Sequence, residues 1–277
     1  MKRILTILAL VALAAACGPS GPNPWLGYVE GEDALISPPQ PGWITHLVVQ
    51  RGQWVKPGDL LFTLDEIHER AARDQAAANL SSMKAQLTQE LANHDYMTTE
   101  LKRQTGLAHA NAGTPTQYDQ ALLGFQQSDR RIPQLESQIK QMEGALADAE
   151  YQLSQRRVVA YTEGRVEDIY FRQGEYAPAQ TPVVSILPPA NVYVRFFIPE
   201  TELQHVKLGQ DVRITCDSCK GEVRATVTFI AQQEEFTAPD IFSVGNREKL
   251  VFKSEARAPG GLKLNPGQPV EVRPLTP

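Results

Sequence analysis

The chain has 277 residues, of which 42% are hydrophobic and 21% are charged, a balance typical of folded rather than disordered proteins. Its net charge is -5 and it has no basic block, so it lacks the electrostatic signature of a nucleic-acid-binding protein. Aromatic residues make up only 7% of the chain, which disfavours one bulky core and favours a long, thin helical part.

The N-terminus is predicted to be a lipoprotein signal that ends at Cys17. Two basic residues precede an apolar run over 4–16, about thirteen residues against the roughly twenty needed to span a bilayer. The run LAAAC that ends at Cys17 resembles a bacterial lipobox, with Ala14 where Leu is usual. We predict that Cys17 is acylated; the alternative is ordinary signal cleavage with an incidental Cys. Gly18 leaves open which membrane holds the lipid.

An internal repeat flanks the middle of the chain. The segment from Gly42, GWITHLVVQRGQWVKPGDLLFTL, aligns without gaps to the segment from Gly164, GRVEDIYFRQGEYAPAQTPVVSI, at a constant offset of 122 residues. Gly52 corresponds to Gly174, and glycine provides the positive φ that tight turns require. Both copies alternate apolar and polar residues as strands do. Because neither half can bury its apolar face alone, we expect the two to pack as a small sandwich.

The residues between the two copies have helical periodicity. In the second predicted helix apolar residues recur at alternating spacings of three and four, the pattern of a coiled-coil seam, and the first helix carries a looser version of this stripe. The seam residues are Leu80, Met83, Leu87, Leu91, Met97 and Leu101 in the first helix and Ile132, Leu135, Ile139, Met142, Leu146, Ala149 and Leu153 in the second. Thr114, Pro115 and Gln117 match a capping box at the start of the second helix. We expect an antiparallel hairpin roughly 60 to 65 Å long, kinked at Pro133.

From Asn191 onward the sequence predicts only strands. The alternating runs are 192–198, 212–215, 223–230, 250–256 and 270–273. Five or so short strands separated by Gly and Pro turns predict a small closed barrel. We also expect an early strand near 27–31 to join it.

Together these features resemble the periplasmic adaptors, or membrane fusion proteins, of the HlyD-like family. The resemblance rests on a split lipoyl-like domain that encloses a helical hairpin and follows a lipoprotein signal. It implies an elongated α+β multidomain fold: a lipoyl-like β-sandwich split by a long antiparallel coiled-coil α-hairpin, plus a small C-terminal β-barrel. The expected divisions are the signal 1–17, a linker 18–27, the first lipoyl-like half with an N-terminal barrel strand 28–65, the hairpin 66–157, the second half 158–190 and the barrel 191–277.

The resemblance also implies a contact at the hairpin tip. Adaptors that meet TolC-like channels carry an Arg, a Leu four residues later and a Ser seven residues after that. Arg103, Leu107 and Thr114 have this spacing here, with Thr in place of Ser. Arg can donate forked hydrogen bonds and Leu can fill a groove between helices. We expect these residues to contact the channel; the alternative is that each is an ordinary helix-end residue.

The implied function is export through a tripartite efflux or secretion system. The expected partners are an inner-membrane transporter, a TolC-like outer-membrane channel, further copies in a homo-oligomeric ring, and a membrane that holds the N-terminal lipid. The expected location is the periplasm of a Gram-negative envelope, with the inner membrane favoured by the function.

The C-terminal region bears on the type of transporter. Residues 234–239 and 247–252 resemble adaptors of ABC-type exporters, and the chain ends soon after the second Gly-Gln turn, at Gly267. Both features favour an ABC-type partner; a proton-driven RND-type pump is the alternative. A lipoyl or biotinyl carrier component of an enzyme is a further alternative, although no Lys stands in a carrier-type turn. A free-standing envelope scaffold is the third.

Cys216 and Cys219 form a lone C-x-x-C in a predicted turn. With Cys17 acylated, they remain as an even pair in an oxidising compartment, which favours a small disulfide. A zinc site would lack further ligands, and a redox dithiol would need a strand-to-helix context.

Enzyme signatures are absent from the sequence. The five His form no metal-binding spacing, and there is no P-loop, G-x-S-x-G or G-x-G-x-x-G motif. The acidic cluster at 65–69 is attributed to a helix start, with Asp65 as N-cap. We therefore predict no catalytic residue, cofactor or metal.

Overall fold

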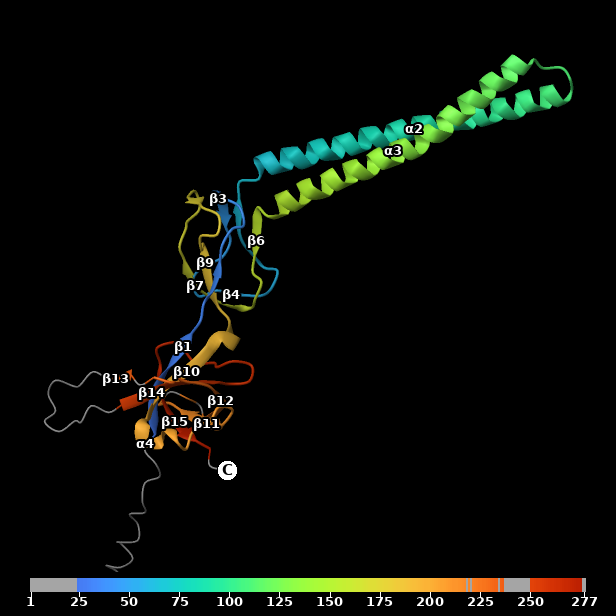
Figure 1. Ribbon diagram of the computed structural model, residues 1–277. Coiled ribbons are helices and arrows are strands. Elements are labelled where there is room, and N and C mark those ends of the chain that lie inside the picture. Colours follow the sequence, from blue (N-terminus) through green and yellow to red (C-terminus); the bar gives the residue numbers. More distant parts are fainter. Residues whose placement is uncertain (1–23, 218, 220, 234, 237–249, 276–277) are drawn as a thin grey trace, which may run out of the picture.

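The computed structural model describes residues 24–217, 219, 221–233, 235–236 and 250–275. Figure 1 shows an elongated molecule in which a barrel, a sandwich and a long helical hairpin follow one another. Among these residues, none of the helices combines the length and the hydrophobicity that crossing a bilayer requires. Cys17 and the predicted signal lie outside the described residues, as do residues 234 and 237–239 of the first and 247–249 of the second segment attributed to ABC-type adaptors.

The sandwich consists of two four-stranded sheets, ordered β2-β9-β7-β4 and β6-β5-β3-β8. Its strands are β2 (Ala34–Ile36), β3 (Gly42–Leu47), β4 (Trp54–Val55), β5 (Leu60–Leu64), β6 (Arg157–Val159), β7 (Gly164–Ile169), β8 (Tyr176–Ala177) and β9 (Val184–Leu187). The two sequence copies exchange strands, because β4 of the first copy pairs with β7 of the second, and β8 of the second pairs with β3 of the first.

The backbone hydrogen bonds reproduce the sequence repeat. The amide of Gly52 donates to the carbonyl of Val166 at 2.8 Å, and that of its counterpart Gly174 donates to the carbonyl of Ile44 at 2.8 Å. Both glycines have positive φ, 82° and 87°. Equivalent apolar side chains from both copies are buried in one core: Ile44 with Val166, Leu61 with Val183, and Leu64 with Ile186. The predicted sandwich is confirmed.

The hairpin consists of α2 (Ile67–His109) and α3 (Pro115–Ser154), which pack against each other along their length (Figure 1). With 43 and 40 residues, the helices are roughly 60 to 65 Å long. The predicted capping box is present at Thr114, and α3 continues through Pro133 as one helix. At the other end, α2 begins with Glu66 as N-cap, so the prediction of Asp65 was wrong by one residue. The Asp65 carboxylate nevertheless accepts a hydrogen bond from the amide of Ile67 at 3.1 Å.

The base of the hairpin is held by contacts across the sandwich. Strands β5 and β6, which lead into and out of the hairpin, are hydrogen-bonded neighbours. The guanidinium of Arg156 donates to the carbonyl of Pro41 at 2.8 Å and forms an ion pair with Glu69 in the first turn of α2. The two helices therefore leave the sandwich side by side.

The seam between the helices differs from the prediction in the middle of α2. Leu91, a predicted seam residue, is 45% exposed. Its place is taken by His94, whose Nδ1 lies 3.0 Å from the Oγ of buried Ser128 and whose ring centroid lies 5.1 Å from that of Phe125. His94 lies seven residues after Leu87, so the seam of α2 keeps its seven-residue repeat through His94 and leaves Leu91 outside.

A glycine lies at the close approach of the two helices. A Cβ added to Gly124 would lie 3.0 Å from the Sδ of Met97, whereas one added to Gly144 would meet nothing within 4 Å. We expect Gly124→Leu to destabilise the hairpin by about 1–3 kcal/mol, since the larger side chain overpacks the contact. Gly144→Leu is the matched control and should stabilise the helix by up to about 1 kcal/mol. Thermal unfolding followed by helical circular dichroism measures both, and equal effects would contradict this packing.

The barrel contains β1 (Trp25–Gly31), β10 (Val192–Pro199), β11 (Asp211–Thr215), β12 (Val223–Ile230), β14 (Leu250–Arg257) and β15 (Pro269–Pro274). The order is β10-β1-β15-β11-β12-β14, and β14 pairs back with β10, which closes the ring. A short strand, β13 (Glu235–Phe236), pairs with β14. The expected N-terminal strand is thus β1, between β10 and β15. A 3-10 turn, η1 (Pro189–Asn191), connects the sandwich to the barrel.

The barrel core lies between these strands and a short helix, α4 (Glu200–Leu203). Phe196 is fully buried and stacks on Trp25, with ring centroids 5.7 Å apart. The indole of Trp25 in turn donates to the carboxylate of Glu202 at 2.6 Å. These contacts connect α4 to β1 and to the barrel core.

An ion-pair network links three strands of the barrel. The guanidinium of Arg195 on β10 donates to Glu30 on β1 at 2.6 Å and to Glu255 on β14 at 3.1 Å. The hydroxyl of Tyr193 donates to Glu30 at 2.7 Å. Burial and this hydrogen bond raise the pKa of Tyr193 well above its ordinary value, so the hydroxyl remains a donor at neutral pH.

Candidate functional site

Among the residues that the structure describes, the hairpin tip lies farthest from the barrel (Figure 1). Helix α2 ends at His109 and α3 begins at Pro115. In the turn between them, Asn111 adopts a left-handed conformation with φ 55°, and the amide of Ala112 donates to the carbonyl of Leu107 at 2.9 Å. Asn tolerates this conformation better than most residues.

Arg103 lies on α2 two turns before the tip. Its guanidinium donates two hydrogen bonds to Glu100, at 2.9 Å from Nε and 2.6 Å from Nη2. The hydrogen bond from Arg103 lowers the pKa of Glu100, and the same bond raises the pKa of Arg103. The Arg103 side chain is still 61% exposed. A partner carboxylate or carbonyl would therefore have to share or replace Glu100.

Leu107 and Thr114 both have roles within the tip. Leu107 lies one turn after Arg103, on the same helix face, and is partly covered by the turn, since a Cβ on Gly113 would lie 3.2 Å from its Cβ. Thr114 is exposed, and its hydroxyl accepts from the amide of Gln117 at 3.3 Å. The structure thus places all three predicted residues at the tip end of the hairpin. Their contact with a channel remains a prediction.

Two polar side chains that were not predicted from the sequence lie in the seam of the hairpin. Gln104 is buried and its amide donates to Glu100 at 2.8 Å, while Ser128 is buried against His94. Gln104 follows Leu101 by three residues and Ser128 precedes Ile132 by four, so both occupy seam spacing. A search that accepted polar residues at these spacings would have found them.

Sequence comparison identifies relatives of the chain. No family model matches it. The uncharacterized protein YdhJ of Escherichia coli K12 is 26% identical over 212 residues, which cover 76% of this chain and 69% of YdhJ. The multidrug export protein EmrA of the same organism is 24% identical over 231 residues, 72% of this chain and 59% of EmrA.

Two solved structures share the fold. MacA from Actinobacillus actinomycetemcomitans superposes with a TM-score of 0.67 at 21% identity, over 90% of this chain and 76% of MacA. The membrane fusion protein Spr0693 from Streptococcus pneumoniae R6 superposes with a TM-score of 0.55 at 16% identity, over 91% of this chain and 98% of that one. The chain is thus similar in sequence to an export protein and shares the fold of solved membrane fusion proteins. The family resemblance and the fold class inferred from the sequence are confirmed.

The two cysteines that follow β11 of the barrel are joined. Cys216 and Cys219 form a disulfide, with Cα atoms 5.1 Å apart, in a turn where the amide of Cys219 donates to the carbonyl of Cys216 at 3.1 Å. Cys216 also packs against the barrel core. Over the described part of the chain, no three His, Cys, Asp or Glu side chains gather in a way that could hold a metal ion.

Proposed function

We propose that this chain is a membrane fusion protein that acts as a periplasmic adaptor and links an inner-membrane transporter to an outer-membrane channel for export. The observation that carries the proposal is the linear arrangement of barrel, sandwich and hairpin, which places the tip farthest from the barrel (Figure 1). The name of EmrA, a multidrug export protein, supports a role in efflux.

Each part has a proposed place in the assembly. The barrel docks at the transporter, the sandwiches pack side by side in a homo-oligomeric ring, and the hairpins form a tube that reaches the channel. Cys17 carries the lipid that holds the chain at a membrane. The mechanism is geometric: the chain seals and spans a gap and performs no covalent chemistry.

For the transporter we propose an ABC-type exporter, with a proton-driven pump as the alternative. The proposal rests on the sequence of 234–239 and 247–252. Affinity purification of the lipid-anchored protein from membranes, followed by mass spectrometry, decides between the two. Recovery of an ATP-binding subunit with its permease supports the proposal, and recovery of a proton-driven pump overturns it.

The channel contact is proposed for Arg103, Leu107 and Thr114. Site-specific photocrosslinking in cells from position 107 tests it, with position 144, in the half of α3 nearer the sandwich, as the matched control. Both positions lie on the hairpin, but only 107 lies near the tip. Adducts of 107 with an outer-membrane channel, absent from 144, support the proposal. Adducts of 107 only with other copies of the chain would reduce the protein to an envelope scaffold.

We expect Arg103→Ala and Leu107→Asp each to lower export at least about tenfold, the effect of losing about 1.4 kcal/mol at a contact hot spot. Lys102→Ala is the matched control, because Lys102 is exposed on the same turn and outside the proposed contact. Export of a labelled substrate from cells measures the effect, and helical circular dichroism checks that the hairpin is folded. Wild-type export by both tip variants would show that the tip assignment is wrong.

A further inference from the structure

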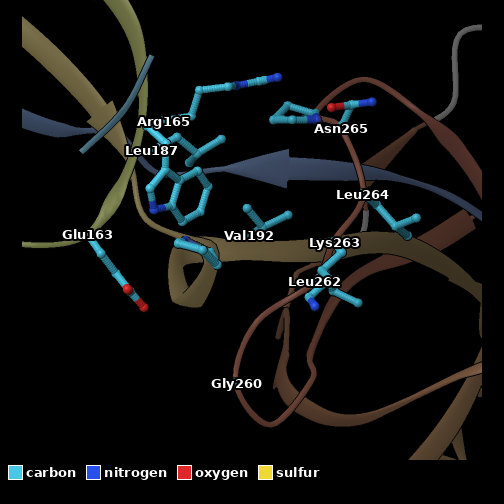
Figure 2. Close-up of a pocket in the computed structure, with 12 residues that line it drawn as sticks. Glu163, Arg165, Leu187, Val192, Gly260, Leu262, Lys263, Leu264 and Asn265 are labelled. Atoms are coloured by element: carbon cyan, nitrogen blue, oxygen red, sulfur yellow. The ribbon is translucent and has the colours of Figure 1, made fainter. Parts of the chain in front are cut away.

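A cavity of about 600 Å³ lies where the sandwich meets the barrel (Figure 2). Its walls come from the sandwich at β4 and β7, from the connector between β9 and β10, and from the barrel loop between β14 and β15. Cavities that hold small molecules usually measure about 300–1,000 Å³ and occur preferentially between domains. The size and the position of this cavity therefore fit a ligand site.

The walls of the cavity are largely apolar. Leu187, Val192 and Leu262 line it and are buried in the structure. Trp54 also lines the cavity but is 52% exposed. An indole with an uncovered face next to buried aliphatic side chains is a suitable surface for stacking an aromatic ring.

Charged side chains stand at the rim. Arg165 and Lys263 line the cavity from opposite domains, and Figure 2 shows them on two sides of the apolar wall. Arg165 donates from Nε to Glu167 at 2.8 Å, while Lys263 forms no ion pair with any residue in the described ranges. Glu163 is the one acidic side chain among the lining residues that the structure describes. Because Arg165 is already paired with Glu167, Lys263 is the rim cation that, within the described ranges, has no ion-pair partner and is available to an anion.

Close backbone contacts fix the shape of the cavity before a ligand arrives. The loop between β14 and β15 approaches the connector so closely that a Cβ on Gly261 would lie 2.0 Å from the carbonyl oxygen of Pro189. On the other side, a Cβ on Gly31 would lie 2.7 Å from Leu187 and 3.2 Å from Pro266. A preformed site loses less free energy in ordering its walls on binding.

We propose that this junction cavity binds a compact aromatic anion. The ring lies on Trp54, and the carboxylate, sulfonate or phosphate group faces Lys263 and Arg165. The ligand contacts both the sandwich and the barrel, so it also links the two parts. This proposal goes beyond the adaptor function and stands without it.

Two dyes test the proposal on the full-length protein. One is 8-anilinonaphthalene-1-sulfonate, and the other is N-phenyl-1-naphthylamine, which has the same rings without the sulfonate. We expect the sulfonate dye to bind one site at least about fivefold more tightly than the neutral dye, as one ion pair near a surface allows. Fluorescence titration measures both affinities. Equal affinities would overturn the proposed charge recognition.

Substitutions locate the site. Trp54→Ala is expected to weaken both dyes about tenfold, because it removes the stacking surface. Lys263→Ala is expected to weaken only the sulfonate dye, about fivefold. The matched controls are Trp43→Ala, since Trp43 is 57% exposed on the sandwich outside the cavity, and Lys140→Ala on the hairpin. Binding that both cavity variants leave unchanged, or that a control weakens as much as its partner, places the dye elsewhere and overturns the proposal.

Discussion

Replacing Phe196 by alanine is expected to destabilise the barrel by about 3–5 kcal/mol, the usual cost of deleting a buried phenylalanine. Phe196 has no exposed surface, and its ring stacks on Trp25, whose indole is hydrogen-bonded to Glu202 on α4. The lost ring would leave a cavity and remove the support of Trp25. Strand β1 and helix α4 should loosen together.

Denaturant unfolding followed by tryptophan fluorescence measures the loss, and helical circular dichroism reports separately on the hairpin. Phe197→Ala is the matched control, because the neighbouring ring is only partly buried and lies 6.3 Å from Tyr28. We expect the control to cost about 1 kcal/mol. Equal losses from the two variants would show that the Trp25–Phe196 stack does not form the centre of the barrel core.

Gly261→Ala is expected to destabilise the joint between sandwich and barrel by about 2–4 kcal/mol. Gly261 has φ 86°, a conformation that costs a residue with a Cβ about 1–2 kcal/mol. The remainder comes from the backbone contact, since the new Cβ would lie 2.0 Å from the carbonyl oxygen of Pro189. The loop would have to move away from the connector, because the contact is with backbone atoms.

The neighbouring glycine separates the two causes. Gly260 has φ 78°, but a Cβ there would meet nothing within 4 Å. Gly260→Ala should therefore cost only the conformational part, about 1–2 kcal/mol. Denaturant unfolding measures stability, and hydrogen exchange of 258–266 shows whether the loop has been released. If the two variants behave alike, the close approach at Gly261 contributes nothing.

The strands of the sandwich were predictable because the two copies of the repeat support each other's assignment. An offset that aligns glycines and apolar residues over twenty or so positions has a low chance of arising by accident. The exchange of strands between the copies was not predictable in the same way. The alignment of Trp54 with Tyr176 predicts that a similar strand begins at each of them. It does not predict whether each strand pairs within its own copy of the repeat or with the other copy. That pairing is decided by packing in three dimensions.

In the hairpin, the positions of apolar residues alone do not predict which side chains lie between the helices. Thr114 and Gln117 were predictable as a cap because the capping box is local. The exposure of Leu91 and the partial burial of His94 were missed because only apolar residues were counted, although His94 lies seven residues after Leu87 and seven before Leu101. At the tip, the spacing of Arg103 from Glu100 by three residues indicates a helical ion pair, yet attention to the family spacing left this pair out of the prediction.

The pairing of β5 with β6 makes the hairpin, seen from the sandwich, a very long turn between two adjacent strands. Its two ends are held together by the backbone bond from the amide of Leu64 to the carbonyl of Arg156, at 2.8 Å. The pairing of the sandwich strands therefore does not depend on the length of the hairpin. Each heptad added to both helices would lengthen the molecule by about 10 Å without disturbing a single strand. In this architecture the length of the hairpin and the core of the sandwich are independent of each other, so the length of the molecule can change while the sandwich stays the same.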